Sequence, residues 1–265
     1  MTAGRGCSVD VADVHFSYHS PQGETPAVAG LSLHAGPGEF VGIVGPSGCG
    51  KSTLFSLVAG LLQPERGEVR IDGQLVRGPR PDVGYMLQQD CLLEWRTVLD
   101  NALLGLEVRR ARDRRAAGQV RMLLARSGLA GFEDRFPREL SGGMRQRTAL
   151  VRTLALNPKL VLLDEPLSAV DAQTRLVLEE EVSRALRDRG ATVLLVTHDI
   201  GEALALCDRV VVLTHRPARV KREYRIELDG GYRSSPVEAR RSPRFSDYFS
   251  LIWADLEVAV NPRVA

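Results

Sequence analysis

The most informative segment of this chain is Gly45-Pro-Ser-Gly-Cys-Gly-Lys-Ser-Thr53, which fits the pattern G-x-x-x-x-G-K-[ST]. An apolar stretch of strand length, 39–44, precedes it, and a stretch with helical periodicity, 52–62, follows it. Glycines let the backbone curl so that successive N–H groups point inward, and the helix N-terminus adds its dipole. The sequence therefore predicts a phosphate-binding loop made of Gly45, Pro46, Ser47, Gly48, Cys49, Gly50, Lys51, Ser52 and Thr53.

Four side chains in and beyond this loop point to the chemistry of a nucleoside triphosphate. The ammonium group of Lys51 can reach the β- and γ-phosphates, and the Ser52 hydroxyl is placed to ligate Mg²⁺. Downstream, the apolar stretch 160–163 ends in two carboxylates. We expect Asp164 to hold the Mg²⁺ directly or through water, and Glu165 to polarise the attacking water as a general base.

Short apolar stretches alternate with helical stretches along the rest of the chain. We expect strands at 9–18, 31–33, 39–44, 68–71, 83–86, 160–163, 192–197 and 210–213, helices at 52–62 and 173–189, and a loop rich in glycine and proline at 19–30. This order predicts an α/β fold with a mainly parallel sheet covered on both faces. The helical block near 92–150 is too long for a simple crossover, so it predicts an inserted helical subdomain.

Composition restricts the class of protein further. The 265 residues are 44% hydrophobic and 26% charged with a formal net charge of +2, which excludes disordered and fibrous chains and provides no overall field for nucleic acid. No apolar run approaches the ~18–20 residues of a membrane-spanning helix, and the first residues lack a secretory signal. We expect a cytosolic protein that meets a membrane only through a partner.

The segment Leu140-Ser-Gly-Gly-Met-Arg-Gln-Arg147 resembles the LSGGQ-type signature of ATP-binding cassette (ABC) ATPases, with Met144 where Gln is more usual. Other kinases and GTPases with a phosphate loop lack this element. Its Ser141, Gly142 and Gly143 would form a second phosphate-binding helix N-terminus. The resemblance implies a homodimer of cassettes in which these three residues bind the ATP of the partner chain.

Further landmarks of the same family follow in order over about residues 8–220. Gln88 resembles the glutamine that senses Mg²⁺ and the γ-phosphate, and 168–171 resembles the D-loop. His198 resembles the switch histidine that contacts the γ-phosphate, and Tyr18 the aromatic residue that stacks on adenine. The resemblance implies a P-loop NTPase core with a mainly parallel sheet, an N-terminal antiparallel β region and a helical subdomain inserted at about 90–152. It divides the chain into an ATPase domain, 8–231, and a short helical tail, 232–265.

Three strings resemble the nitrate/sulfonate/taurine group of bacterial importers: 92–97, 196–203 and 213–220. Ala218 replaces a glycine of that group, and Glu94 stands where proline is frequent. The resemblance implies cofactors ATP and Mg²⁺, integral membrane permease subunits, an extracytoplasmic solute-binding protein as an indirect partner, and a peripheral location on the cytoplasmic face of the inner membrane. Trp95 would lie at the cleft that receives a coupling helix of the membrane subunit. Importers of thiamine precursors and riboflavin share these strings, so the solute stays open.

Two other kinds of ABC protein stay open as alternatives. One is the ATPase of an exporter, which the sequence excludes only weakly. The other is a soluble ABC protein that acts on nucleic acid, with the basic stretch 109–121 as its binding surface. Such proteins usually carry two cassettes or long coiled-coil insertions, so we expect no nucleic-acid partner. A small-molecule kinase would have no use for the signature segment.

We expect no ligand-sensing domain of the kind that some importer cassettes carry, because the tail 232–265 is shorter than such a domain. The stretch 245–256, Phe-Ser-Asp-Tyr-Phe-Ser-Leu-Ile-Trp-Ala-Asp-Leu, is amphipathic at helical spacing. We therefore expect one C-terminal helix that packs on the core.

Overall fold

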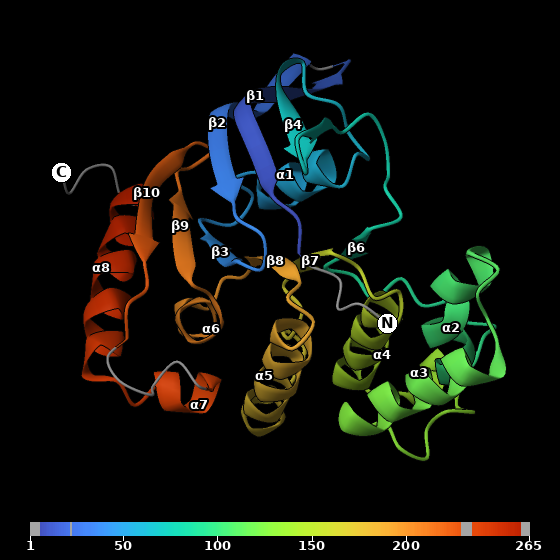
Figure 1. Cartoon of the computed structure of the whole chain (residues 1–265). Helices are drawn as coiled ribbons and strands as arrows, with labels where there is room; N and C mark the ends of the chain where they lie inside the picture. Colours follow the sequence, from blue (N-terminus) through green and yellow to red (C-terminus); the bar gives the residue numbers. More distant parts are fainter. Residues whose placement is uncertain (1–5, 22, 229–234, 261–265) are drawn as a thin grey trace.

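The computed structural model describes residues 6–21, 23–228 and 235–260, arranged as two sheets with helices around them (Figure 1). The strands are β1 (Val9–Ser20), β2 (Gly23–Ala35), β3 (Phe40–Val44), β4 (Arg66–Ile71), β5 (Gln74–Leu75), β6 (Val83–Met86), β7 (Leu160–Asp164), β8 (Thr192–Val196), β9 (Arg209–Leu213) and β10 (Val220–Arg225). The helices are α1 (Lys51–Val58), α2 (Val98–Val108), α3 (Arg114–Arg126), the 3₁₀ turn η1 (Pro137–Glu139), α4 (Gly142–Ala155), α5 (Ala172–Arg187), α6 (Ile200–Leu206), α7 (Pro236–Ala239) and α8 (Pro243–Val260). Among the helices described, none is both long enough and apolar enough to cross a bilayer.

The larger sheet confirms the expected mainly parallel core. Its strand order is β10-β9-β3-β8-β7-β6, and only the edge strand β10 runs antiparallel to its neighbour. All five residues of β7 and all five of β8 are buried, because both faces of the sheet are covered. In β7, Leu160 and Leu162 belong to the core shared with α1, whereas Val161 and Leu163 belong to the core beneath α4 and α6. Because it serves two cores, β7 is apolar at every position before Asp164, its last residue.

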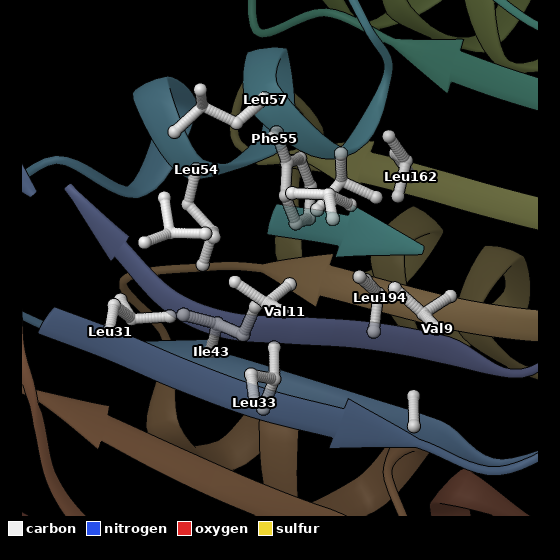
Figure 2. Packing of buried hydrophobic residues seen from close by; sticks show 14 of the residues in the cluster. Val9, Val11, Leu31, Leu33, Ile43, Leu54, Phe55, Leu57, Leu162 and Leu194 are labelled. Carbon is white, nitrogen blue, oxygen red and sulfur yellow. The ribbon is translucent and has the colours of Figure 1, made fainter. Parts of the chain in front are cut away.

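The smaller sheet, β2-β1-β4-β5, is antiparallel and confirms the expected N-terminal β region. It lies over α1 on one side of the large sheet, while α4, α5 and α6 lie on the other (Figure 1). Figure 2 shows the core between them, with Val9, Val11, Leu31, Leu33, Ile43, Leu54, Phe55, Leu57, Leu162 and Leu194 labelled. Each such side chain contributes roughly 1.5–3 kcal/mol when fully buried, so this core holds the phosphate loop between two rigid layers.

The expected loop at 19–30 is wrong over most of its length, because β2 begins at Gly23. Its ladder with β1 runs from Ser20 opposite Gly23 to Val9 opposite Ala35. Pro26 is tolerated because β2 forms an edge of the sheet, where a missing N–H need not break a ladder bond. Composition alone suggested a loop, whereas pairing with β1 makes the segment a strand.

The helix after the phosphate loop is also shorter than expected, since α1 ends at Val58 rather than near 62. Gly60 adopts a positive φ of 75°, which ends the helix, and the N–H groups of Leu61 and Leu62 both donate to the carbonyl of Ser56. A Cβ on Gly60 would lie 2.3 Å from the carbonyl oxygen of Gly78, so this position has room only for glycine. Strands β5 and β10 and helix α6 were not expected.

Helices α2, α3 and α4 form the expected helical block, with its own core. That core contains Val98, Leu99, Ala102, Leu103, Val120, Leu124, Leu129 and Val151. The basic stretch 109–121 begins directly after α2 and covers a loop and much of α3, and two of its arginines have partners close by. Arg112 forms ion pairs with Asp100 at 2.6 Å and Glu107 at 2.8 Å, and Arg109 donates to the Leu156 carbonyl. Part of this positive charge is therefore used in contacts that stabilise the helical block.

The expected C-terminal helix is present and longer than 245–256, because α8 covers Pro243–Val260. Ile252 of α8 is fully buried against the large sheet, and Asp255 accepts a 2.6 Å hydrogen bond from the Tyr224 hydroxyl of β10. The proposed boundary between 231 and 232 lies outside the described residues.

A buried ion pair joins this C-terminal part to α5. The Glu179 side chain of α5 is fully buried, and Arg240, directly after α7, approaches its two oxygens at 2.7 and 3.0 Å. Burial raises the pKa of Glu179, and the Arg240 guanidinium opposes that rise. Removing the arginine would leave a buried carboxylate without its compensating charge.

We predict that Arg240→Ala lowers the free energy of unfolding by about 3 kcal/mol, the order found when one partner of a buried pair is removed. Chemical denaturation measures this. The matched control is Arg241→Ala, since Arg241 pairs with Glu238 at the surface and should change stability by less than about 0.5 kcal/mol. Equal stability of the two variants would contradict the role given to the buried pair.

Candidate active site

A cavity of about 440 Å³ opens where the carboxyl ends of β3, β7 and β8 meet. Parallel strands present these ends at one edge of the sheet, so the residues that follow each strand converge there. The residues that line the cavity are Gly45, Ser47, Gly48, Gly50, Lys51, Ser52, Thr53, Gln88, Asp164, Glu165, His198 and Arg216. Apart from Arg216, all of them were expected from the sequence.

The phosphate loop has the geometry that its glycines permit. Gly48 and Gly50 adopt positive φ values of 70° and 121°, and a Cβ on Gly50 would lie 2.5 Å from the Ala27 carbonyl oxygen. The Lys51 side chain is 8% exposed, and its Nζ donates to the carbonyls of Gly45 and Pro46 at 2.8 and 2.9 Å. The ammonium group is therefore held across the loop, beside the space that phosphates would fill.

Cys49 and Pro46 belong to the loop without lining the cavity. Cys49 is buried beneath the loop, and burial raises the pKa of its thiol, while the charge of Lys51 opposes that rise. Its role in the described structure is packing.

Two side chains from distant parts of the chain, those of Gln88 and His198, meet at one carboxylate oxygen of Glu165. Glu165 Oε2 accepts a hydrogen bond from Gln88 Nε2 at 3.3 Å, and His198 Nδ1 lies 3.4 Å from the same oxygen. The Glu165 backbone has a positive φ of 49°, and its N–H donates to the Val196 carbonyl at 2.8 Å. A non-glycine residue in this conformation costs about 1–3 kcal/mol, so the surrounding structure holds Glu165 in place.

Asp164 lies deeper in the cavity and is 2% exposed. Burial raises its pKa, a hydrogen bond with Ser52 opposes this, and the neighbouring Glu165 carboxylate adds to the rise. A buried carboxylate beside a hydroxyl and the Gln88 amide is a set of oxygen donors that suits Mg²⁺, whose charge would stabilise the ionised carboxylate. Tyr85 faces the same carboxylate, and burial together with the Asp164 charge raises the pKa of its phenol to about 12.

Tyr18 lies beside the cavity rather than in its wall. The residue is 45% exposed, and its ring packs edge-to-face on Phe16 with centroids 5.1 Å apart. The hydroxyl is within 3.1 Å of Thr53 Oγ1, which connects it to the first turn of α1. An exposed ring held in this way can offer a face to a base.

The signature segment does not join the phosphate loop within one chain. Ser141 caps the N-terminus of α4 and accepts a hydrogen bond from the Met144 N–H at 3.3 Å. Neither Ser141 nor Gly142 nor Gly143 lines the cavity described above. Gly142 instead lines a neighbouring groove that also includes Gln88.

Gln146 is a residue for which the sequence suggested no role, although it follows the signature glycines by one turn. Its Nε2 donates to the Glu165 carbonyl at 2.8 Å and to Ser168 Oγ at 3.1 Å, and its Oε1 accepts from the Ala169 N–H. It is buried, so these bonds are shielded from water. Gln146 therefore links the signature helix to the backbone of Glu165.

A second unexpected set of hydrogen bonds, made by Thr197, Asp199 and Glu202, stabilises the loop that carries His198. Thr197 Oγ1 donates to the Glu202 carboxylate, and Asp199 caps α6 by accepting from the Glu202 N–H at 3.1 Å. Burial raises the pKa of Glu202 to about 7. The Thr197 hydrogen bond and the charge of Arg175 oppose the rise, whereas the Glu179 and Asp199 carboxylates add to it. The sequence alone does not reveal this, because the partners come from different elements.

A family model described as ABC transporter matches residues 28–168, which is more than half of the chain. The chain belongs to the ABC transporter family. Similar proteins include an uncharacterized ABC transporter ATP-binding protein of Bacillus subtilis, 43% identical over 93% of this chain and 94% of that protein. The taurine import ATP-binding protein of Ruegeria pomeroyi is 38% identical over 96% of this chain and 97% of that protein. A nitrate import ATP-binding protein of Synechocystis sp. is 37% identical over 91% of this chain and 91% of that protein.

Solved structures of ABC cassettes show the same fold. One is a dimeric post-hydrolysis state of the cassette MJ0796 bound to ADP and phosphate, with a TM-score of 0.74 and 31% identity over 83% of this chain and 99% of that one. The α/β P-loop NTPase fold expected from the sequence is thereby confirmed. The chain is an ABC-type ATPase.

We predict that the free energy of unfolding of Glu202→Gln, relative to that of the wild type, increases as pH rises. Because the folded-state pKa of Glu202, about 7, lies above its ordinary value of 4.5, the folded wild type binds more protons than the unfolded chain between these values. This group's contribution to the free energy of unfolding is therefore largest below pH 4.5 and falls until about pH 7. The amide has no such dependence.

Urea denaturation at pH 5 and pH 8 tests this, with Glu24→Gln as a control for removing an exposed carboxylate of β2. The stability of Glu202→Gln relative to wild type should increase between the two pH values, and that of the control should not. A pH-independent difference would show that Glu202 does not titrate in this range in the folded protein.

Proposed function

We propose that this chain is the ATP-hydrolysing subunit of a bacterial ABC importer, which couples Mg-ATP hydrolysis to uptake of a small solute through separate membrane subunits. The observation that carries the catalytic part is the convergence of Gln88 and His198 on the Glu165 carboxylate beside the phosphate loop. Support for import comes from relatives named as taurine and nitrate import ATP-binding proteins, which match along nearly their whole length.

In the proposed reaction, the loop amides and the Lys51 ammonium bind the phosphates of Mg-ATP. Ser52, Asp164 and Gln88 hold the Mg²⁺ of that substrate, which neutralises phosphate charge. Glu165 accepts the proton of the attacking water, and the strained backbone and the Gln88 amide orient its carboxylate. His198 contacts the γ-phosphate, and Tyr18 stacks on the adenine.

Two copies of the chain share each nucleotide in this proposal. Ser141, Gly142 and Gly143 lie outside the chain's own cavity, yet they begin a helix of 14 residues whose N-terminus can bind an anion. The solved relatives are described as dimeric cassettes, which agrees with such an arrangement. Closure around ATP would bring the partner's signature onto the γ-phosphate. In each chain, Gln146 would connect the signature segment with Glu165 of that same chain.

Motion would pass to the membrane through the segment that follows Gln88. Arg145 of the signature segment binds Asp90 at 2.9 Å and Glu94 at 2.8 Å, so α4 and the segment after Gln88 would move together. Trp95 beyond it is 75% exposed, which suits a contact with an integral membrane permease subunit at the cytoplasmic face of the inner membrane. The solute class we propose is small oxyanions such as nitrate, sulfonates or taurine, delivered by an extracytoplasmic solute-binding protein.

We predict that Glu165→Gln binds ATP but hydrolyses it ~10²–10⁴-fold more slowly, since the amide keeps the shape and loses the base. With hydrolysis blocked, Mg-ATP should hold two chains together, whereas ADP should not. Adding Ser141→Arg should abolish this dimer by steric clash and leave ATP binding to the single chain intact. Light scattering of both proteins with ATP and ADP decides the matter, and a double variant that still dimerises on ATP excludes a shared site.

We also predict that, in cells that depend on this chain, uptake of labelled nitrate, taurine or an alkanesulfonate stops with Glu165→Gln. It should fall at least tenfold with Trp95→Ala, because the contact with the permease is weakened at its aromatic anchor. Trp253→Ala is the control, since Trp253 is also exposed but lies on α8. Normal transport by Trp95→Ala would exclude this contact, and unchanged uptake of all three solutes by Glu165→Gln would exclude the proposed solute class.

A further inference from the structure

The turn between β9 and β10 packs directly on the phosphate loop. Ala218 is fully buried, its N–H donates to the Ala27 carbonyl at 2.8 Å, and its carbonyl accepts from the Ala29 N–H at 3.1 Å. A Cβ on Gly50 would lie 3.1 Å from the Cβ of Ala218. The turn therefore forms part of the floor on which the last glycine of the phosphate loop rests.

Hydrogen bonds within the turn hold its shape. Thr214 Oγ1 donates to the carbonyls of His215 and Pro217 at 3.0 and 3.2 Å and accepts from the Arg219 N–H at 3.1 Å. The Thr214 N–H donates to the Arg219 carbonyl at 3.0 Å, which closes the turn. Because these hydrogen bonds fix the backbone of the turn, they also fix the position of the Arg216 backbone within it.

Arg216 lies in this turn and lines the same cavity as Lys51, Glu165 and His198. Within the described part of the chain, its exposed guanidinium has no hydrogen bond or ion pair, and its charge acts on Cys49 of the phosphate loop. Other arginines of the large sheet behave differently: Arg209, for example, is tied to Glu39 and Glu223. Arg216 is thus a preplaced cation that the protein itself does not neutralise.

We propose that Arg216 is a further nucleotide-binding residue, whose guanidinium binds the phosphate chain of the nucleotide held in the same chain's cavity. A planar guanidinium matches a phosphate with two parallel N–H donors, which a lysine cannot provide. Arg216 would act beside Lys51 and raise affinity for both ADP and ATP. The inference rests on the proposed placement of the nucleotide in this cavity. The family model does not cover Arg216, because its match ends at residue 168.

The test is the dissociation constant of fluorescent Mg-ADP and Mg-ATP analogues for the purified full chain, with light scattering to confirm that it is a single chain in ADP. Arg216→Ala should weaken binding of both nucleotides roughly tenfold, as expected for loss of a charge-assisted hydrogen bond. Arg216→Lys should recover part of the affinity. Arg219→Ala is the matched control, because Arg219 belongs to the same turn and does not line the cavity, and its binding should equal that of wild type.

Lys51→Ala separates this inference from the placement on which it rests. If Lys51→Ala loses binding while Arg216→Ala binds both nucleotides as wild type does, the site stands and the role of Arg216 is wrong. If Lys51→Ala also binds normally, the nucleotide does not lie in this cavity. If Arg216→Ala impairs only ATP-driven dimerisation and leaves ADP binding unchanged, Arg216 contacts the partner chain, and the inference fails.

Discussion

The candidate active site depends on the parallel hydrogen bonding of β3 between β8 and β9. This pairing brings the phosphate loop, the end of β8 and the turn after β9 to one edge of the sheet. β7 pairs on the outer side of β8 and adds its two carboxylates at the same edge. The apolar interior of both layers fixes these strands, so the polar groups at their ends cannot move apart.

The same edge concentrates charges that burial penalises. Asp164 is nearly inaccessible, and its pKa is raised by burial and by the carboxylate beside it. Lys51 is turned back on the carbonyls of its own loop, while Arg216 points into the cavity from a rigid turn without a partner in the described structure. This arrangement of unmatched charges suits a ligand that brings both phosphates and a divalent cation.

The links between the elements matter as much as the site itself. Gln146 joins the signature helix to Glu165, Arg145 joins it to the segment before Trp95, and Thr197 and Glu202 support the loop that carries His198. Farther back, Arg240 connects α5 to the C-terminal helices. Each link is a hydrogen bond or an ion pair between a helix and a residue of a neighbouring loop, so the loops of the site are held to the helices around them.

The local sequence was enough to predict the phosphate loop, the carboxylates after 160–163, the signature segment and the parallel sheet. Each of these is encoded by a short run of residues whose spacing is set by backbone geometry. β2 could not be predicted, because only its pairing with β1 makes a strand of a segment containing glycine and proline. Four further features were likewise hidden, since each arises from groups distant in the chain that packing brings together: the early end of α1, the three hydrogen bonds of Gln146, the raised pKa of Glu202 and the position of Arg216. Sequence spacing thus determined which groups could bind a nucleotide, whereas tertiary packing decided which further groups line the cavity or support its walls, because burial and pairing depend on the complete fold.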